Sequence, residues 1–244
     1  MGDYKLRGSK MEVKPKAELI DYTDNPERNV ATAARLCYSK KGADRLNEEM
    51  SREQVENLVR KVVNMGHTST LEHTYFFFHV QCSRVTSHQI VRQRIGTSYS
   101  QRSQRYVTED NFDYITPPKI KKNEEAYKKY QEKMEELEET YLEFIEMGVP
   151  KEDARFILPT IKTNIVISYN ARSLMHFLRL RTCNRAQWEI RSIAWQMLNE
   201  VKKVAPVIFE NAGPPCETDG ECPEGDLSCG KIDKIKAKKA EAKT

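Results

Sequence analysis

The clearest hydrophobic pattern lies near residue 60, where one apolar stripe has the spacing of a helix. Its members recur every three or four residues: Val55, Leu58, Val59, Val62 and Val63. Ser51 and Gln54 have the S-x-x-Q spacing of a capping box, which ties the first turn of a helix to its N-cap residue. Gly66 follows the stripe and suits the left-handed position that commonly ends a helix. The pattern therefore predicts a helix that begins after Ser51 and ends at Gly66.

Other segments have either helical spacing of apolar residues or dense β-branched and aromatic residues. Strands are expected at 12–24, as an edge strand, at 71–82, as a buried strand, and at 163–169. Helices are expected at 27–38, at 84–94, at 122–147, between Pro150 and Pro159, at 171–181 and at 186–204. The segment 94–106 is expected to be irregular. Because strands and helices do not alternate regularly, the sequence predicts an α+β fold: one domain whose central, mainly antiparallel sheet is flanked by helices.

Both ends of the chain differ in composition from the middle. Residues 1–10, MGDYKLRGSK, precede a second methionine, Met11, and are interpreted as a leader or cloning remnant. Residues 214–244 are poor in hydrophobic side chains, which predicts a disordered tail that contains cysteines. The folded domain is therefore expected to span residues 11–213.

The overall composition is that of a soluble protein with a highly charged surface. Hydrophobic residues make up 39% of the chain, charged residues 31%, and the formal net charge is +4. The longest dense apolar run, at 75–80, is far too short to cross a bilayer. With no secretion signal at the N-terminus, we expect a cytoplasmic protein without a membrane partner.

The six cysteines fall into two groups. Cys37, Cys82 and Cys183 have hydrophobic neighbours and are expected to be reduced, buried residues. The other three stand in the tail with the spacing Cys216-x5-Cys222-x6-Cys229. That spacing contains no CxxC pair, and three thiols are one short of a tetrahedral site. The sequence therefore predicts no metal site.

Arginine is concentrated in one part of the chain. Five arginines and no acidic residue lie between Arg84 and Arg105, where the segment 92–106 reads RQRIGTSYSQRSQRY. Guanidinium groups with neighbouring hydroxyls suit polyanionic ligands. A nucleotide and a nucleic acid both fit this composition, and a solvated basic face is the plainer alternative. The chain has neither G-x-G-x-x-G nor G-x-x-x-x-G-K-[ST], so any nucleotide cofactor is held in another way.

The segment 92–106 resembles the signature of the flavin-dependent thymidylate synthases. That signature opens with R-H-R and continues to a serine and an arginine-tyrosine pair, which Ser103, Arg105 and Tyr106 match. Three departures are clear: Gln93 replaces the usual histidine, one extra residue separates Arg94 from Ser103, and Ser100 and Gln101 replace an Asn-Glu pair. Gln101 cannot carry the charge of the glutamate. Further segments resemble the same family in the right order: AARLCY at 33–38, GHTSTLEH at 66–73, HQIVRQR at 88–94, ARFILP at 154–159 and NARSLMHFLRLR at 170–181.

The resemblance implies a reaction and a set of ligands. A methylene group would pass from methylenetetrahydrofolate to dUMP to give dTMP, with tightly bound FAD, reduced by NADPH, as the hydride source. The residues expected to bind dUMP are Gln89, Arg92, Gln101, Ser103, Gln104, Arg105, Arg155 and Arg181. The residues expected to contact FAD are His67, Ser69, Arg92, Gln93, Arg94, Gln101, Asn170, Arg172 and His176. Arg181 is the expected catalytic residue, because a guanidinium beside the uracil ring would stabilise negative charge on it.

The resemblance also implies a homotetramer with shared active sites, so that Arg155 would reach the dUMP of a neighbouring subunit. His176 and Arg185 replace an asparagine and a histidine of the family, which weakens the flavin assignments there. Removal of everything after Gly213 is expected to leave FAD binding and assembly intact. Two alternatives stay open: an inactive relative, because of Gln93 and Gln101, and a nucleic-acid-binding module. The expectation from the motifs is that nucleic acid is not a partner.

Overall fold

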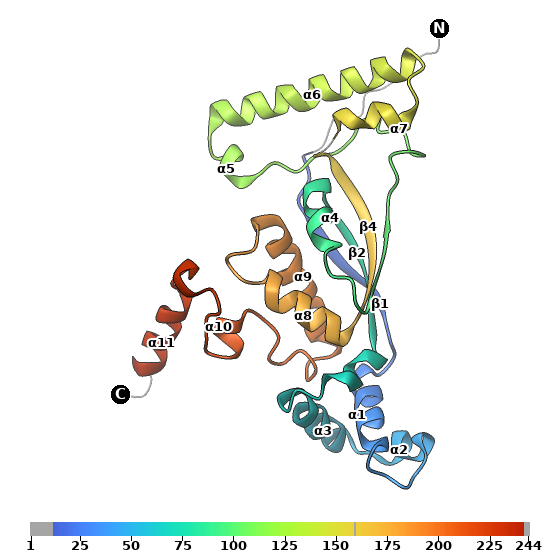
Figure 1. The fold of residues 1–244 in the computed structure, drawn as a ribbon, viewed down its shortest axis with the longest axis vertical. Helices are drawn as coiled ribbons and strands as arrows, with labels where there is room; N and C mark the ends of the chain where they lie inside the picture. Colours follow the sequence, from blue (N-terminus) through green and yellow to red (C-terminus); the bar gives the residue numbers. More distant parts are fainter. Residues whose placement is uncertain (1–11, 159, 242–244) are drawn as a thin grey trace. The chain divides into compact units, whose positions relative to one another are not determined.

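The computed structural model of the chain describes residues 12–158 and 160–241, with no description of the side chains of 238–241. The expected leader at 1–10 and Pro159 of the ARFILP segment lie outside the described residues. Figure 1 shows the arrangement of helices and strands along the chain.

Four strands form one sheet in the order β1-β2-β4-β3. The strands are β1 (Lys16–Tyr22), β2 (Tyr75–Ser83), β3 (Thr97–Gln101) and β4 (Lys162–Asn170). Hydrogen bonds join the end of β2 to the start of β4 (Arg84 N to Ile161 O, 3.1 Å) and the end of β4 to the start of β2 (Ala171 N to Thr74 O, 2.9 Å). In the same way, the end of β3 pairs with the start of β4, and the end of β4 pairs with the start of β3. The sheet is therefore antiparallel, as the sequence predicted.

Helices make up most of the remaining chain. The longer ones are α1 (Pro26–Leu36), α3 (Arg52–Asn64), α6 (Glu124–Glu146), α8 (Ala171–Arg181), α9 (Trp188–Val204) and α11 (Lys231–Glu241). The shorter ones are α2 (Ala43–Glu49), η1 (Thr68–His73), α4 (Arg84–Ile90), α5 (Pro118–Lys121), α7 (Lys151–Ala154), η2 (Arg155–Ile157), α10 (Pro215–Thr218) and η3 (Gly225–Leu227).

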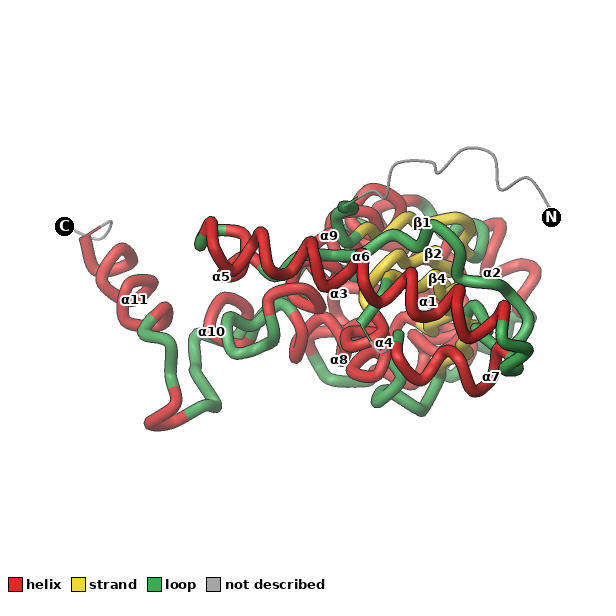
Figure 2. Tube along the Cα trace, turned by 90° about the horizontal axis from the view of Figure 1, so that it is seen from above, coloured by secondary structure: helices red, strands yellow, loops and turns green. Residues whose placement is uncertain are grey.

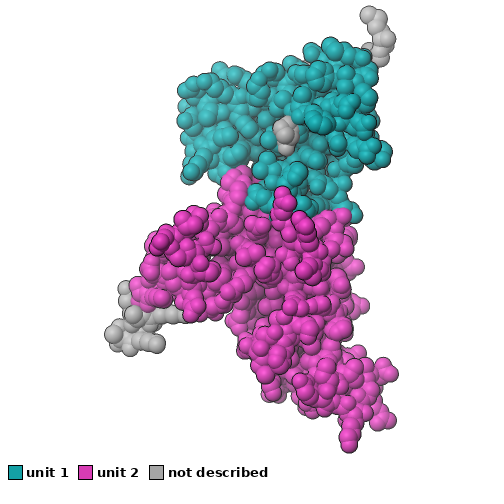
Figure 3. Space-filling model, in the orientation of Figure 1, with its two compact units in different colours: residues 1–16, 80–91, 100–165 teal, residues 17–79, 92–99, 166–244 magenta. Residues whose placement is uncertain are grey.

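The chain divides into two compact units, which are coloured separately in Figure 3. Unit 1 comprises residues 1–16, 80–91 and 100–165, and unit 2 comprises 17–79, 92–99 and 166–244. Strands β2, β3 and β4 each contribute residues to both units. This division differs from the single domain expected from the sequence, because compactness depends on contacts that no local pattern records.

The core of unit 1 forms beneath helix α6. Asn123 caps this helix by accepting a hydrogen bond from Ala126 N at 3.0 Å. Its apolar side chains at helical spacing, Met134 and Tyr141 among them, are buried against the segments before and after it. The partners are Phe112, Tyr114, Ala154, Leu158 and Ile161. The long helix therefore packs on its own unit, as its three- and four-residue spacing predicts.

In unit 2, aromatic side chains fasten helices to the sheet. The rings of Tyr169 on β4 and Phe177 on α8 lie 5.4 Å apart, and those of Phe76 on β2 and Phe209 lie 5.2 Å apart. Gln196 of α9 accepts a hydrogen bond from Ala17 N of β1 at 3.0 Å. Figure 2 shows these helices in a second view. Helix α8 is thereby held to β4, the strand it directly follows, and α9 is held to β1, which is distant in sequence.

Several local predictions are confirmed, and others are wrong. The Ser51–Gln54 capping box is present at the start of α3, and Gly66 follows its end with φ +73°. Strand β1 lies at the edge of the sheet. The expected irregular segment 94–106 contains β3, and α2 had no predicted counterpart. The expected buried strand from residue 71 begins instead at Tyr75, after η1.

The prediction of a disordered tail is wrong for residues 214–241. This segment contains α10, η3 and α11, and it buries Cys216 and Ile232. The physical reason is contact with the end of α8: Arg179 pairs with Asp219 at 2.5 Å, a contact that composition cannot reveal.

Candidate functional site

Three segments that the sequence assigned to a flavin meet at the start of helix α8. Asn170 N donates to Gly96 O at 2.9 Å, and the Ser173 hydroxyl donates to Ile95 O. Ala171 N donates to Thr74 O at 2.9 Å, which joins η1 to the same point. Residues 67–74, 92–97 and 170–173 are therefore hydrogen-bonded into one structure, all within unit 2.

A glycine makes this junction possible. Gly96 has φ +67°, a backbone conformation that favours glycine. A Cβ atom at this position would lie 2.3 Å from Asn170 Nδ2 and 2.5 Å from Ser173 Oγ. Only a residue without a side chain lets the loop after the RQR segment approach α8 this closely.

Six of the expected flavin residues expose their side chains around this junction: His67, Ser69, Arg92, Arg94, Arg172 and His176. Arg172 and His176 are one helical turn apart on α8 and share a face, and Arg172 also pairs with Glu72 of η1 at 2.5 Å. The exposed donors of these residues are available to a ligand or to another subunit.

Two other residues expected to contact the flavin make hydrogen bonds within the protein. Asn170 is buried and accepts a hydrogen bond from Ser173 N at 2.8 Å, which makes it the N-cap of α8. The carbonyl of Gln93 accepts from the hydroxyl of Tyr99 at 2.6 Å and from Thr97 Oγ1 at 3.2 Å. Both residues shape the junction, so their first role is to position the residues beside them.

A second group of candidates gathers in unit 1 around helix α7. Arg105 Nε and Glu152 Oε2 lie 3.0 Å apart, and Arg155 Nε donates to the carbonyl of Glu152 at 3.0 Å. Arg84, the first residue of α4, is half-buried, and burial lowers the pKa of its guanidinium. The positive charge of Arg155 lowers the pKa of Arg84 further, so these two cations repel each other. This concentration of positive charge suits an anionic group.

Arg84 was not among the site residues predicted from the sequence. It belongs to the arginine-rich stretch but precedes the matched motif by eight residues. The available signal was its place in a stretch without acidic residues. The nearby carboxylate of buried Glu109 is already paired with Arg102, at 3.0 Å. Burial raises the pKa of Glu109, and the positive charge of Arg102 lowers it.

The polar candidates of unit 1 have specific partners. Gln101 Nε2 lies 3.1 Å from Ser87 Oγ and 3.3 Å from Thr163 Oγ1, so it links the end of β3 to α4 and β4. Ser103 Oγ accepts from Arg105 N at 3.3 Å, and Gln89 is half-buried on α4. Gln104 is buried, and its Nε2 has no hydrogen-bond partner among the described residues. An unsatisfied buried donor of this kind suits a bound acceptor.

Arg181 lies at the opposite end of α8 from Arg172. Their positions differ by nine, which corresponds to roughly 13 Å along a helix. Burial raises the pKa of Tyr169 well above its ordinary value, Tyr99 adds to this, and the positive charge of Arg181 opposes it. The charge of Arg181 thus acts on the phenol of buried Tyr169, and the Arg181 side chain is itself half-buried.

The expected residues thus fall into two sets. All expected flavin residues except Gln101 belong to unit 2. The expected dUMP residues belong to unit 1, except Arg92 and Arg181. Among the described residues, no group of three or more His, Cys, Asp or Glu side chains could hold a metal ion, and no helix is long and apolar enough to cross a membrane.

Comparison with known proteins places the chain in a family. Residues 18–207 match the family model described as thymidylate synthase complementing protein. The flavin-dependent thymidylate synthase of Geobacter sulfurreducens is 47% identical over 225 residues, covering 91% of this chain and 96% of its own. Those of Clostridium tetani and Pyrococcus furiosus are 44% and 43% identical and cover 95% and 86% of this chain (98% and 89% of their own). The chain therefore belongs to the flavin-dependent thymidylate synthase family.

A solved structure has the same fold. The crystal structure of the UMP/dUMP methylase PolB from Streptomyces cacaoi, bound with 5-Br dUMP, superposes with a TM-score of 0.73 at 24% identity. It covers 82% of this chain and 94% of its own. At this level of identity, the likeness shows the fold, an antiparallel sheet flanked by helices.

Proposed function

We propose that this chain converts dUMP to dTMP, with methylenetetrahydrofolate as carbon donor and FAD, reduced by NADPH, as hydride source. The observation that carries the proposal is the junction of residues 67–74, 92–97 and 170–173, where segments far apart in sequence present their polar side chains together. The family relatives are named flavin-dependent thymidylate synthases, and the junction consists of segments that resemble that family's motifs.

The donor set at the junction fits a flavin nucleotide. Arg92, Arg94 and Arg172 would supply charged donors to its phosphates, and Ser69 and His67 would supply neutral ones. The backbone amides of Ala171 and Ser173 at the start of α8 are already bonded, so these two amides are not part of the proposed donor set. When bound, FAD supplies the hydride that completes the methyl group.

The donor set of unit 1 fits a nucleoside monophosphate. Arg105, Arg155 and Arg84 would surround the phosphate, and the hydroxyl of Ser103 would donate to it. The unsatisfied Nε2 of buried Gln104 would donate to an acceptor of the same ligand. The repulsion between Arg84 and Arg155 would be relieved by the phosphate charge.

The proposed chemical role of Arg181 is electrostatic. Its guanidinium would lie beside the uracil ring and stabilise negative charge there, which favours the ionised N3 and increases electron density at C5. Ser103 is assigned to phosphate binding and not to nucleophilic attack, because no base partners its hydroxyl among the described contacts.

Binding of FAD and formation of dTMP test the proposal directly. The purified protein should have a flavin absorption spectrum or bind added FAD stoichiometrically. It should then form dTMP when dUMP, methylenetetrahydrofolate and NADPH are all supplied. Each omission should abolish the product. A colourless protein that does not bind FAD in a titration would exclude the proposed reaction.

Two outcomes would favour the alternatives. If the protein binds FAD and dUMP but makes no dTMP with any reductant, it is an inactive relative of the family. Gln93 and Gln101 would then be the residues to change back to the family's histidine and glutamate. A protein without flavin whose binding to nucleic acid weakens steeply with salt is the binding module. The arginines alone do not distinguish an enzyme from a nucleic-acid-binding module. Binding to the phosphate backbone of a nucleic acid, however, does not require the junction at α8.

We further propose a cytoplasmic homotetramer with shared active sites. Three side chains next to proposed site arginines are large, apolar and exposed: Ile95 (82%), Tyr106 (76%) and Phe156 (78%). A subunit interface would bury such apolar surface, which is favourable in water. A neighbouring subunit that covers them would bring its own donors to the same site.

A further inference from the structure

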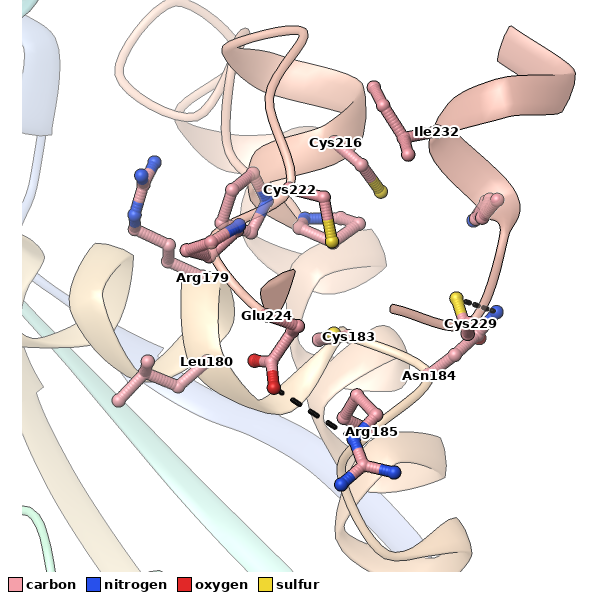
Figure 4. Close-up of a pocket in the computed structure, with 14 residues that line it drawn as sticks. Arg179, Leu180, Cys183, Asn184, Arg185, Cys216, Cys222, Glu224, Cys229 and Ile232 are labelled. Atoms are coloured by element: carbon pink, nitrogen blue, oxygen red, sulfur yellow. Dashed lines mark hydrogen bonds and ion pairs between the residues drawn. The ribbon is translucent and has the colours of Figure 1, made fainter. Parts of the chain in front are cut away.

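Four of the six cysteines line one pocket in unit 2. Cys183 follows the end of α8, Cys216 lies in α10, and Cys222 and Cys229 lie in the tail before α11. The pocket contains about 550 Å³ of empty space, including the part open to solvent. Figure 4 shows the four sulfur atoms around this common space. The fourth thiol missing from the tail spacing is therefore supplied by Cys183.

The surroundings of the thiols are apolar. Pro214, Pro215, Pro223 and Ile232 line the same pocket, and all four cysteines are free thiols. Two of the sulfur atoms have hydrogen-bond partners: Asn184 Nδ2 donates to Cys229 Sγ at 3.6 Å, and Cys222 Sγ lies 3.5 Å from Ser228 Oγ. Soft sulfur ligands in an apolar shell, one of them accepting a hydrogen bond, are typical of metal–thiolate centres.

Ion pairs hold the thiol-bearing segments in place without any metal. Arg179 of α8 pairs with Asp219 at 2.5 Å, Arg185 with Glu224 at 3.8 Å, and Lys231 with Glu217. Each of these cations faces an acid, which offsets much of its charge beside the thiols. A cationic centre between the sulfurs would supply the positive charge that four thiolates require.

The arrangement favours a cluster over a single ion. A zinc ion needs its sulfur ligands about 2.3 Å from one point, and paired zinc ligands are usually two to four residues apart. Here the spacings are five and six residues, and no three of these thiols stand in an arrangement that could hold one ion among the residues described. Four thiolates around a wider space are the ligand set of an iron–sulfur cluster.

We propose that Cys183, Cys216, Cys222 and Cys229 bind an iron–sulfur cluster that fastens the tail to the end of helix α8. The site lies outside the proposed FAD and dUMP residues. Three of its cysteines also lie beyond residue 207, where the match to the family model ends. The sequence by itself predicted no metal site here, because its spacing showed only three of the four ligands.

Metal and sulfide analysis of the full-length protein tests this proposal. Protein prepared without oxygen, or reconstituted with ferrous iron and sulfide, should contain about four iron and four sulfide ions per chain, the content of a cubane cluster. About two of each would also support a four-thiolate cluster. Low-temperature electron paramagnetic resonance of the reduced protein should show a fast-relaxing signal that a flavin radical does not give.

Single alanine variants identify the ligands. Cys183→Ala, Cys216→Ala, Cys222→Ala and Cys229→Ala should each lose most of the iron and sulfide. Cys37→Ala is the matched control, because Cys37 is an exposed free thiol outside the pocket, and its iron content should equal that of the unmodified chain. Circular dichroism and flavin content measured on the same samples separate loss of the cluster from loss of the fold.

Three results would overturn the proposal. One is a single zinc ion per chain without sulfide, and another is no bound metal after reconstitution. The third is iron retained in all four pocket variants. None of these measurements depends on dTMP formation, so failure of the cluster and failure of the proposed reaction can be told apart.

Discussion

At the scale of single residues, Arg181 is the side chain with the most specific proposed role. It lies half-buried at the end of α8, close enough to Tyr169 for its charge to affect the pKa of the phenol. A guanidinium that is partly withdrawn from solvent acts more strongly on a neighbouring charge than an exposed one does. The proposed flavin residues Asn170 and Arg172 lie at the other end of the helix, so flavin binding and uracil activation should be separable.

We predict that Arg181→Lys lowers dTMP formation by about two to three orders of magnitude, the usual effect of losing one preorganised donor, or about 3 to 4 kcal/mol. Lysine keeps the charge but loses the planar fork of donors. Flavin content and flavin reduction by NADPH should not change. Arg60→Lys, on the surface opposite Glu210, is the control and should have normal turnover. Normal turnover of Arg181→Lys would remove this residue from the chemistry.

Arg84 carries the second prediction at this scale. If its half-buried guanidinium binds the dUMP phosphate with Arg155, Arg84→Gln should raise the KM for dUMP roughly 10-fold or more, because a hydrogen bond to a charged group contributes about 1.5 to 3 kcal/mol. Saturating dUMP should restore most of the rate. Arg52→Gln removes a charge from an exposed helix end and should leave KM unchanged. A lowered kcat with unchanged KM would contradict phosphate binding by Arg84.

At the scale of elements, the loop after the RQR segment depends on its contact with the start of α8. Gly96→Ala would place a Cβ 2.3 Å from Asn170 Nδ2 at a φ of +67°. We predict loss of FAD binding, because the clash separates Arg92 and Arg94 from Arg172. Gly148→Ala is the control: its φ of +83° gives comparable backbone strain of about 1 to 3 kcal/mol, but nothing lies within 4 Å. FAD bound normally by Gly96→Ala would show that the junction does not form the flavin site.

The tail gives the second prediction about elements. Removal of residues after Gly213 exposes the end of α8 and loses the burial of Cys216 and Ile232. If this lowers the free energy of unfolding by roughly 2 kcal/mol, the melting temperature should fall by about 4 to 8 °C in a chain of this size. FAD content should stay normal, since the flavin junction is at the other end of α8. A chain ending at Ala237 keeps all the cysteines and is the control; equal melting temperatures for both truncations would mean that the tail contributes nothing.

At the scale of the whole molecule, the proposed site residues are split between two compact units and, by our proposal, between subunits. If Arg155 acts on the dUMP of a neighbour, Arg155→Ala and Arg181→Ala should each be inactive alone. Co-assembly of the two variants should restore about one quarter of normal activity, the fraction of sites that receive both native residues when one residue comes from each of two chains. No recovery in confirmed hybrid oligomers would place both arginines in the same chain's site.

The sequence by itself determined the elements with strong local signals and the family motifs. The capping box of α3 and the periodic stripe of α6 depend on residues within a few positions of one another, so pattern and structure agree. The short β3 had no such signal: its burial alternates only weakly, and its pairing with β4 comes from residues more than sixty positions away. Tertiary pairing, not local propensity, makes that segment a strand.

Only the tertiary structure decided which distant residues meet. No spacing rule connects Gly96 with Asn170 or Arg84 with Arg155, because these pairs are brought together by the antiparallel pairing of the strands. The same holds for the cysteines: the tail shows three thiols, and the fourth, Cys183, lies 33 positions before Cys216. A ligand set is a property of positions in space, and a chain that returns to an earlier helix places residues together that are far apart in sequence.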